Sequence, residues 1–390
     1  MYNFDEIVDR QGTACFKYDG RQRVFGRADV LPLWVADMDV LTPPFVLERL
    51  RARCQHPVMG YTFRDGAYNK AIVWWYAERH GWAIQGRWIK FCPGVVAGLS
   101  HAVRAFTEPG DAVIIQTPVY HPFYSAVTNN GRRLALNPLI NRDGHYTMDL
   151  EHLAQLAAAG AKMLILCSPH NPVGRVWSRE ELEALGQVCT RYGLLVVADE
   201  IHSDLIFAGH RHVSIAAISD DLAQRTITFG SASKTFNIAG LTCGFAIIPN
   251  DGLRKRYAAE MEASGAGSGN LFGFEALKAA YTPAGAEWLD ELMAYFAGNV
   301  DLVEQTLQSQ LPSVRMERPE GTYLLWLDFS AWGLDAERLR HRLVDEALLG
   351  LNAGTEFGTE GATYQRMNIA CSRATVREAL SRLVRVGAPR

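Results

Sequence analysis

Four short apolar segments constrain the fold of this 390-residue chain most strongly. They occupy residues 112–116, 163–167, 194–197 and 226–229, and patterns typical of helices lie between them. Short strands that alternate with helices in this way favour a mostly parallel sheet covered by helices on both faces. Such sheets bind their ligands beyond the carboxyl ends of the strands. We therefore expect an α/β fold with its functional site where these four segments end.

Polar or aromatic residues follow each of the four segments. Tyr120 lies in TPVYHPF, Asn171 in SPHNPVG, Asp199 in VVADEIH and Lys234 in SASKTFNIAG. A lysine amine can capture a reactive carbonyl when burial and neighbouring groups lower its pKa. Most lysines are exposed on the surface, so Lys234 by itself indicates little. The combination of motifs is far more specific than any one of them.

A further motif, CPGVVAG at residues 92–98, follows a short strand expected at 88–91 and opens a helix. Backbone amides at the start of a helix attract phosphate. An ordinary strand-to-helix turn has the same pattern, so this interpretation depends on the other motifs. Together with them, it predicts a phosphate cradle formed by the amides of Val95 and Val96 and helped by the Ser231 hydroxyl.

At these motifs the chain resembles the fold-type I enzymes that use pyridoxal 5′-phosphate (PLP), the aspartate-aminotransferase superfamily. The stretches VDRQGT, LPLWVADMDV, MGYT, GTYLLWLDF and RMNIACSR make it most similar to the bacterial MalY/PatB-type cystathionine β-lyases, which are C–S lyases. The resemblance covers nearly the whole chain. It implies a large PLP-binding domain at 51–284, a smaller α+β domain at 285–390, and an N-terminal arm with the start of the small domain at 1–50.

The resemblance assigns cofactor-binding roles to several residues. Lys234 would carry PLP and act as the catalytic base, and Asp199 would keep the pyridine nitrogen protonated. Tyr120 could stack on the ring, while Asn171 and His202 would lie near its oxygen. The remaining cofactor contacts would come from Val95, Val96, Ser231, Ser233 and Tyr61, the last from the partner subunit of a homodimer. Thr242 stands where aminotransferases often place a phosphate-binding arginine, a departure that the C–S lyases share.

Substrate contacts are also implied. Arg366 in QRMN matches the arginine that binds the substrate α-carboxylate, a task that suits the planar guanidinium. Trp34, Tyr61 and Asn171 are the other expected substrate contacts, although Trp34 in an apolar run could equally be part of the core. The implied reaction is β-elimination from a small sulfur-containing amino acid, such as cystathionine or cysteine, giving pyruvate, ammonia and a thiol.

Two alternatives to β-elimination remain open. The first is transamination, because the same carbanion can be reprotonated on the cofactor. The second is a regulatory role, because some relatives bind and restrain a transcription activator. Sequence motifs favour elimination but do not identify the substrate.

The composition of the chain argues against binding to nucleic acid or to a membrane. A net charge of −3 provides no basic surface for nucleic acid or an acidic membrane, and no apolar run reaches the roughly 18–20 residues of a transmembrane helix. The opening MYNFDEIVDR does not resemble a signal peptide. Seven scattered cysteines without a CxxC pair predict free thiols in the cytoplasm and no metal site.

Overall fold

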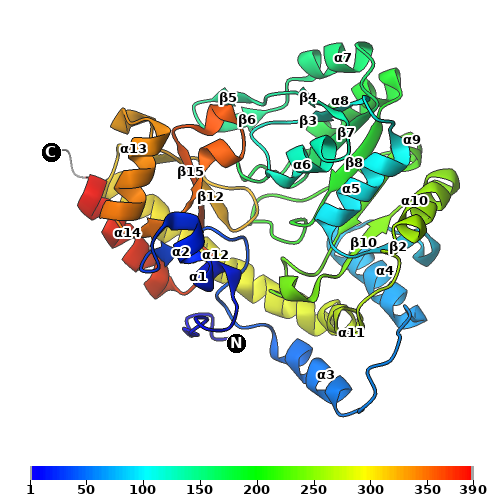
Figure 1. Ribbon diagram of the computed structural model, residues 1–390, viewed down its shortest axis with the longest axis horizontal. Coiled ribbons are helices and arrows are strands. Elements are labelled where there is room, and N and C mark those ends of the chain that lie inside the picture. Colours follow the sequence, from blue (N-terminus) through cyan, green and yellow to red (C-terminus); the bar gives the residue numbers. More distant parts are fainter. Residues whose placement is uncertain (1, 388–390) are drawn as a thin grey trace.

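The computed structural model describes residues 2–387, and its centre is a seven-stranded sheet (Figure 1). In sheet order, the strands are β2 (Ile89–Cys92), β10 (Gly244–Ile247), β9 (Thr226–Gly230), β8 (Leu195–Asp199), β7 (Met163–Cys167), β3 (Ala112–Ile115) and β4 (Arg133–Leu136). The run from β9 to β4 is parallel, whereas β10 is antiparallel to both of its neighbours. The predicted mostly parallel sheet is confirmed.

Helices cover both faces of this sheet because its strands are apolar on both sides. Val113 and Ile115 of β3 pack into one core cluster, whereas Ile114 packs into another. The first cluster lies under α5 (Val95–Phe106), α6 (Pro122–Thr128) and α10 (Asp251–Ala263). The second lies under α7 (Leu150–Ala158), α8 (Arg179–Tyr192) and α9 (Asp220–Gln224). The spacing of Ser178 and Glu181 in the sequence predicts a capping box, and these two residues form one at the start of α8.

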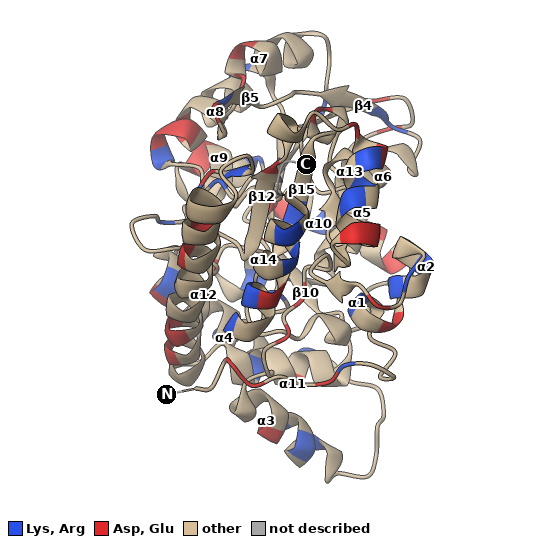
Figure 2. Cartoon of the chain, turned by 90° about the vertical axis from the view of Figure 1, so that its left-hand side faces the viewer, with Lys and Arg blue, Asp and Glu red and all other residues tan. Residues whose placement is uncertain are grey.

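A second, antiparallel sheet lies in the C-terminal part of the chain. Its strands, in order, are β11 (Arg315–Met316), β12 (Leu324–Asp328), β15 (Tyr364–Asn368) and β14 (Asn352–Ala353). The neighbouring helices are α12 (Pro283–Gln310), α13 (Ala336–His341) and α14 (Arg373–Gly387). The charged residues of α12 are acidic and those of α14 are mostly arginines, so the two neighbouring helices differ in charge (Figure 2).

The apolar pattern of residues 335–348 predicts a single helix, and this prediction is wrong in its second half. Helix α13 ends at His341 and a π-helical turn, Arg342–Glu346, follows it. Leu348 then takes a left-handed φ of 55°, and strand β13 (Leu349–Gly350) begins. A backbone that turns left-handed cannot continue a helix, and the apolar pattern of the sequence does not reveal this.

The N-terminal segment packs against the C-terminal part of the chain (Figure 1). After the short helices α1 (Phe16–Asp19) and α2 (Arg21–Phe25), strand β1 (Leu31–Pro32) pairs in parallel with β13. The chain then continues through α3 (Pro44–Cys54) and α4 (Gly66–His80), and the connection between them loops away from the body (Figure 1). Division into an arm and two domains, at 1–50, 51–284 and 285–390, stays a prediction.

The remaining elements are short or peripheral. They are helix α11 (Leu271–Ala280), the hairpin of β5 (Ile140–Arg142) and β6 (His145–Thr147), and the 3₁₀ turns Gly86–Trp88, Ile215–Ala217, Ala239–Leu241, Ser330–Trp332, Gly354–Glu356 and Thr359–Gly361. Across residues 2–387, no helix combines the length and the hydrophobicity needed to cross a bilayer.

Candidate active site

A cavity of about 410 Å³ lies at the carboxyl ends of the central strands. Asp199, the last residue of β8, is paired across the sheet with Cys167 of β7 and Phe229 of β9, so these strands end at one edge. The predicted site residues that line the cavity are Val95, Val96, Tyr120, Asn171, Asp199, His202, Ser233 and Lys234. Parallel strand order therefore brings together motifs that are distant in the sequence.

Lys234 lies in the turn after β9, and its amine faces this cavity. Nζ donates a hydrogen bond of 2.6 Å to the Ala36 carbonyl. Burial, together with the Arg366 charge, lowers the pKa of Lys234 to about 8 against the opposing effects of Asp37 and Asp199. Roughly a tenth of this amine is therefore unprotonated at pH 7, far more than for an exposed lysine, and a nucleophile or a base requires the unprotonated form.

Asp199 is a buried carboxyl without a cationic hydrogen-bond partner among the described residues. Its side chain is 5% exposed and accepts one hydrogen bond, of 3.1 Å, from the Ile201 amide. Burial raises the pKa of Asp199 to about 7, although Lys234 and the hydrogen bond oppose this. An N–H donor with positive charge in the cavity would restore its ionised form. A protonated pyridine nitrogen has this chemistry.

Arg366 of β15 is fixed by three acceptors but has no ion-pair partner within residues 2–387. Its Nη1 donates to Asn171 Oδ1 at 3.0 Å, and its Nη2 donates to the Trp34 carbonyl at 2.8 Å and to Asn352 Oδ1 at 2.5 Å. The guanidinium lies 4.8 Å from the ring centre of Phe357, and burial lowers its pKa to about 10. A buried guanidinium held by neutral groups is suited to bind a carboxylate.

His202 and Tyr120 complete the walls of the cavity. His202 is 3% exposed, and its Nδ1 has no hydrogen-bond partner in the described part of the chain. Burial, with the charges of Lys234 and Arg366, holds the pKa of His202 well below its usual value, so the imidazole is neutral. Tyr120 is half-buried, and its amide donates to the Asn171 carbonyl at 3.1 Å. A neutral imidazole with a free nitrogen can form a hydrogen bond with a ligand oxygen.

The start of α5 lies against the cavity, at the position where the sequence predicts a phosphate cradle. Gly94 precedes the helix at a φ of 125°, a conformation that favours glycine. The first amides of a helix lack intrahelical acceptors, and Val95, Val96 and Ala97 all line the cavity. The structure thus offers backbone N–H groups and the positive end of a helix dipole to an anion.

Ser231 lies outside the lining of the cavity. Its hydroxyl donates to the Cys243 carbonyl at 2.7 Å and accepts a hydrogen bond of 3.1 Å from the Ser233 amide. Ser231 thereby orders the turn before Lys234, and its proton already has an acceptor. Of the two serines, only Ser233 reaches the cavity directly.

Trp34 meets the site through its backbone. Its indole is 7% exposed, packs at 5.5 Å from the Phe25 ring, and donates to the Lys17 carbonyl at 3.0 Å. The sequence allowed both a core role and a substrate contact. In the structure the side chain belongs to the local core, and the carbonyl contacts Arg366.

Tyr61 does not reach the cavity of its own chain. It is fully exposed on the loop between α3 and α4, beside the exposed side chains of Val58, Met59 and Phe63. The predicted cofactor contact through Tyr61 therefore requires a second subunit. An exposed apolar group of this kind is typical of an interaction surface.

Sequence reasoning missed two groups that contact predicted residues, and a third that contacts one of those two. The Ala36 carbonyl accepts from Lys234 and also from the Tyr323 hydroxyl, at 3.0 Å, and Asn352 accepts from Arg366. Ala36 and Tyr323 lie within stretches that carry the resemblance, LPLWVADMDV and GTYLLWLDF, so those stretches were the available signal. Asn352 lies outside these stretches, so no sequence signal indicated its contact with Arg366.

Comparisons with known proteins agree with this geometry. The family model for aminotransferase class I and II matches residues 28–383. The chain is 45% identical to cystathionine beta-lyase PatB of Bacillus subtilis (strain 168) and 33% identical to protein MalY of Escherichia coli (strain K12), in each case over 98% of both chains. It also matches the crystal structure of cystalysin from Treponema denticola, which contains PLP, with a TM-score of 0.96 and 36% identity over 99% of this chain and 98% of that chain.

Proposed function

Because the chain belongs to the aminotransferase class I and II family of PLP-dependent enzymes, we propose that it cleaves carbon–sulfur bonds of cysteine-type amino acids by β-elimination. The products would be pyruvate, ammonia and a thiol. The observation that carries this proposal is the arrangement of the site, in a chain similar over its length to a named cystathionine beta-lyase: the Lys234 amine and the Asp199 carboxyl line one cavity, and the buried Arg366 charge lies outside its lining but near enough to lower the pKa of Lys234.

The residues of the cavity fit PLP. Asp199 would hold the ring nitrogen, Asn171 and His202 the ring oxygen, and Tyr120 one face of the ring. The α5 amides and Ser233 would hold the phosphate, and Lys234 would bind the aldehyde carbon. When bound, PLP withdraws electrons from the substrate Cα and so permits loss of its proton and of the β-substituent.

Arg366 would bind the substrate, and Lys234 would remove its proton. Arg366 would bind the substrate α-carboxylate, because its guanidinium is oriented by the Asn171, Asn352 and Trp34 oxygens and stacked on Phe357. This contact would fix Cα in front of Lys234. The Lys234 amine would then take the Cα proton at Nζ, for which its lowered pKa suits it.

The proposal is tested by assaying pyruvate and free thiol from L-cystathionine with the purified, PLP-loaded protein. We expect equal amounts of both products, and we expect their loss in Lys234→Ala. The matched control is Lys90→Ala, which removes a half-buried lysine whose pKa burial also lowers but which lines a different cavity. A keto acid together with pyridoxamine phosphate, without pyruvate, would contradict elimination and assign the chain to the aminotransferases.

We further propose a homodimer in which Tyr61 of the partner subunit contacts the cofactor phosphate. Exposure of Tyr61, Val58, Met59 and Phe63 on one loop supports this assembly. The test is to mix the Tyr61→Ala and Lys234→Ala proteins, unfold them together and refold the mixture. Heterodimers would each regain one intact composite site, so about a quarter of the wild-type activity should return. No recovery, with dimers present by light scattering, would exclude a shared site.

The regulatory alternative and the cellular location stay predictions. Binding to a transcription activator would need a surface outside the cavity, and a pull-down with Lys234→Ala would separate such binding from catalysis. The free state of all seven cysteines supports the predicted cytoplasmic location.

A further inference from the structure

Residues 34–40, here called the strap, cross the site with their backbone carbonyls turned toward side-chain donors. Six of these carbonyls accept such hydrogen bonds. The donors are Arg366 for Trp34 (2.8 Å), Asn368 for Val35 and Asp37 (2.6 Å each), Lys234 and Tyr323 for Ala36 (2.6 and 3.0 Å), Arg10 and Asn237 for Met38 (3.1 and 3.0 Å), and Asn237 for Val40 (2.7 Å). Two of the donors, Lys234 and Arg366, are the cations of the proposed active site.

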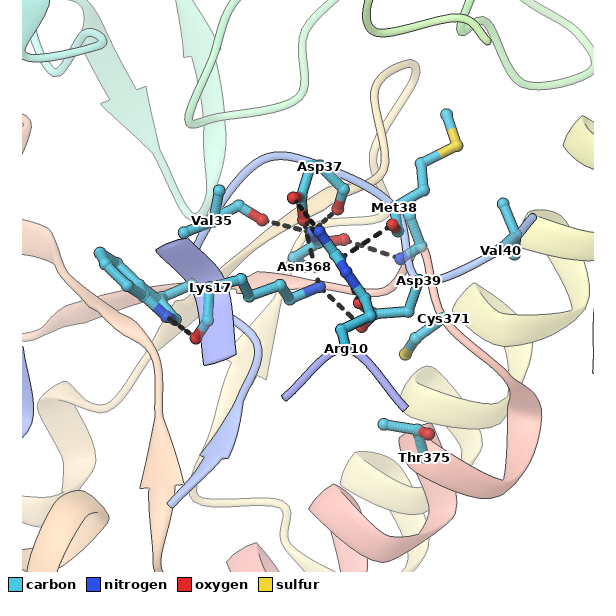
Figure 3. A network of polar contacts seen from close by, with 12 residues as sticks. Arg10, Lys17, Val35, Asp37, Met38, Asp39, Val40, Asn368, Cys371 and Thr375 are labelled. Carbon is cyan, nitrogen blue, oxygen red and sulfur yellow. Dashed lines mark hydrogen bonds and ion pairs between the residues drawn. The ribbon is translucent and has the colours of Figure 1, made fainter. Parts of the chain in front are cut away.

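Four charged residues tie the strap to residues 10–17, which precede it in the chain (Figure 3). Lys17 has no exposed surface, and its Nζ lies 2.7 Å from Asp39 Oδ2 and 3.7 Å from Asp37 Oδ1. Arg10 forms ion pairs of 2.6 Å with each of these carboxylates. A buried ammonium is costly unless it is paired, so Lys17 holds the strap carboxylates in one place.

Two amides attach the strap to the elements that carry the site cations. Asn368 lies two residues beyond Arg366 at the end of β15, and its Nδ2 donates to two strap carbonyls (Figure 3). Asn237 lies three residues beyond Lys234 and bonds both the amide and the carbonyl of Met38. The strap therefore has defined contacts with both sides of the cavity, and the ion pairs fix it from behind.

We propose that Arg10, Lys17, Asp37 and Asp39 are positioning residues of the active site: their ion pairs fix the strap and thereby hold the Trp34 and Ala36 carbonyls against Arg366 and Lys234. This inference deepens the proposed function and rests on it only for steady-state kinetics. If the strap moved, Arg366 would lose one of three acceptors, and the Lys234 ammonium would lose its 2.6 Å acceptor.

Direct charge effects must be separated from this positional effect. The charged or titratable groups that act on Lys234 are Arg366 from β15, Asp199 from β8 and Asp37 from the strap, and His202 lies near enough to feel its charge. In Lys17→Met, loss of a positive charge would by itself raise the pKa of Lys234. Release of the strap would lower it, because an ammonium without its acceptor is less stable. The two explanations therefore predict opposite signs.

The experiment measures the pH midpoint for acetylation of Lys234 in the cofactor-free protein, read by mass spectrometry after trace labelling. The variants are Lys17→Met, Asp39→Asn and Asn237→Gly. The control is Arg318→Met, which removes a positive charge and two ion pairs, with Asp301 and Glu304, that do not involve the strap. We expect each of the three variants to lower the midpoint by about one pH unit, and the control to leave it unchanged.

In the PLP-loaded enzyme the same three variants should raise the KM for L-cystathionine about tenfold, because the Arg366 fork loses an oriented acceptor. A midpoint that rises or stays constant in folded Lys17→Met would overturn the proposal. If that variant does not fold by circular dichroism, Asn237→Gly decides. It changes no charge and suits the φ of 53° at this position, so an unchanged midpoint there would overturn the proposal equally. If the wild-type protein had no lyase activity but the variants still lowered the acetylation midpoint of Lys234, the proposed function would be refuted and the positioning role would stand.

Discussion

Asp199→Asn should stabilise the cofactor-free protein while it disables the enzyme. In the folded chain, burial raises the pKa of Asp199 from its usual 3.8 to about 7. Between these values the folded state binds more protons than the unfolded state, so the stability falls as pH rises through this range. The difference corresponds to an upper limit of about 4 kcal/mol lost by pH 8 relative to pH 3. Asparagine keeps the shape and the acceptor for the Ile201 amide but carries no charge.

The assay is urea unfolding of the cofactor-free protein at pH 5 and pH 8. Asp199→Asn should unfold at a higher urea concentration than the wild type at pH 8, with a smaller gain at pH 5. In the PLP-loaded state, kcat should fall about 10²–10³-fold, because the ring nitrogen loses its anionic partner.

A matched control lies five residues along the chain. Asp204 is also buried, but its carboxylate accepts hydrogen bonds from Trp75 (2.8 Å) and Thr235 (2.7 Å) and pairs with His80, and these partners hold its pKa below the usual value despite burial. Asp204→Asn should therefore lower the stability at both pH values. If Asp199→Asn destabilised the cofactor-free protein at pH 8 as Asp204→Asn does, Asp199 would be a structural anchor and the reasoning would be refuted.

Three further predictions concern Arg366, Lys234 and Gly98. Arg366→Lys should raise the KM for L-cystathionine about 10–100-fold with a smaller effect on kcat in steady-state assays, because an ammonium cannot reproduce the fork. The rate at which PLP reacts with the cofactor-free protein, followed by absorbance, should increase as pH rises through about 8, where the Lys234 ammonium loses its proton; a rate independent of pH from 6 to 9 would contradict this. Gly98→Ala should destabilise the protein by about 1–3 kcal/mol in urea unfolding, because its Cβ would lie 2.4 Å from the Phe229 ring between α5 and β9; a loss below 0.5 kcal/mol would show that the helix shifts freely.

The central sheet and the cavity could be predicted from local patterns. Segment 163–167 is apolar on both faces, and segment 226–229 is rich in β-branched residues; polar residues follow both, and the parallel strand rule places those ends together. Because these strand ends meet at one edge of the sheet, Asp199 and Lys234 line the same cavity. The roles predicted for Lys234, Asp199 and Asn171 came from the resemblance to the PLP-dependent family and not from the strand pattern.

Contacts across the long connections could not be predicted in the same way. Lys17 is a charged residue of the short helix α1, and charged residues are mostly exposed, yet its side chain is fully buried beside two carboxylates. For Trp34 the side chain was expected to contact the substrate, but it packs in the core, and only the backbone carbonyl contacts a site residue, Arg366. Neither result follows from periodicity, because both depend on how the arm folds back over β15.

The arm and strap explain how two site cations remain buried without permanent ionic partners. Lys234 and Arg366 both have lowered pKa values because burial disfavours their charge, and a carboxylate beside either one would restore it but block the substrate. Neutral acceptors avoid this conflict: carbonyl oxygens from Trp34 and Ala36 satisfy the N–H groups and leave the net positive charge for a carboxylate ligand. Carbonyls on an irregular segment need an external support, and the ion pairs of Lys17 and Arg10 provide it at a distance from the reacting atoms. Asp37 and Asp39 lie outside the lining of the cavity, so the positive charges of Lys234 and Arg366 stay available for an anionic substrate.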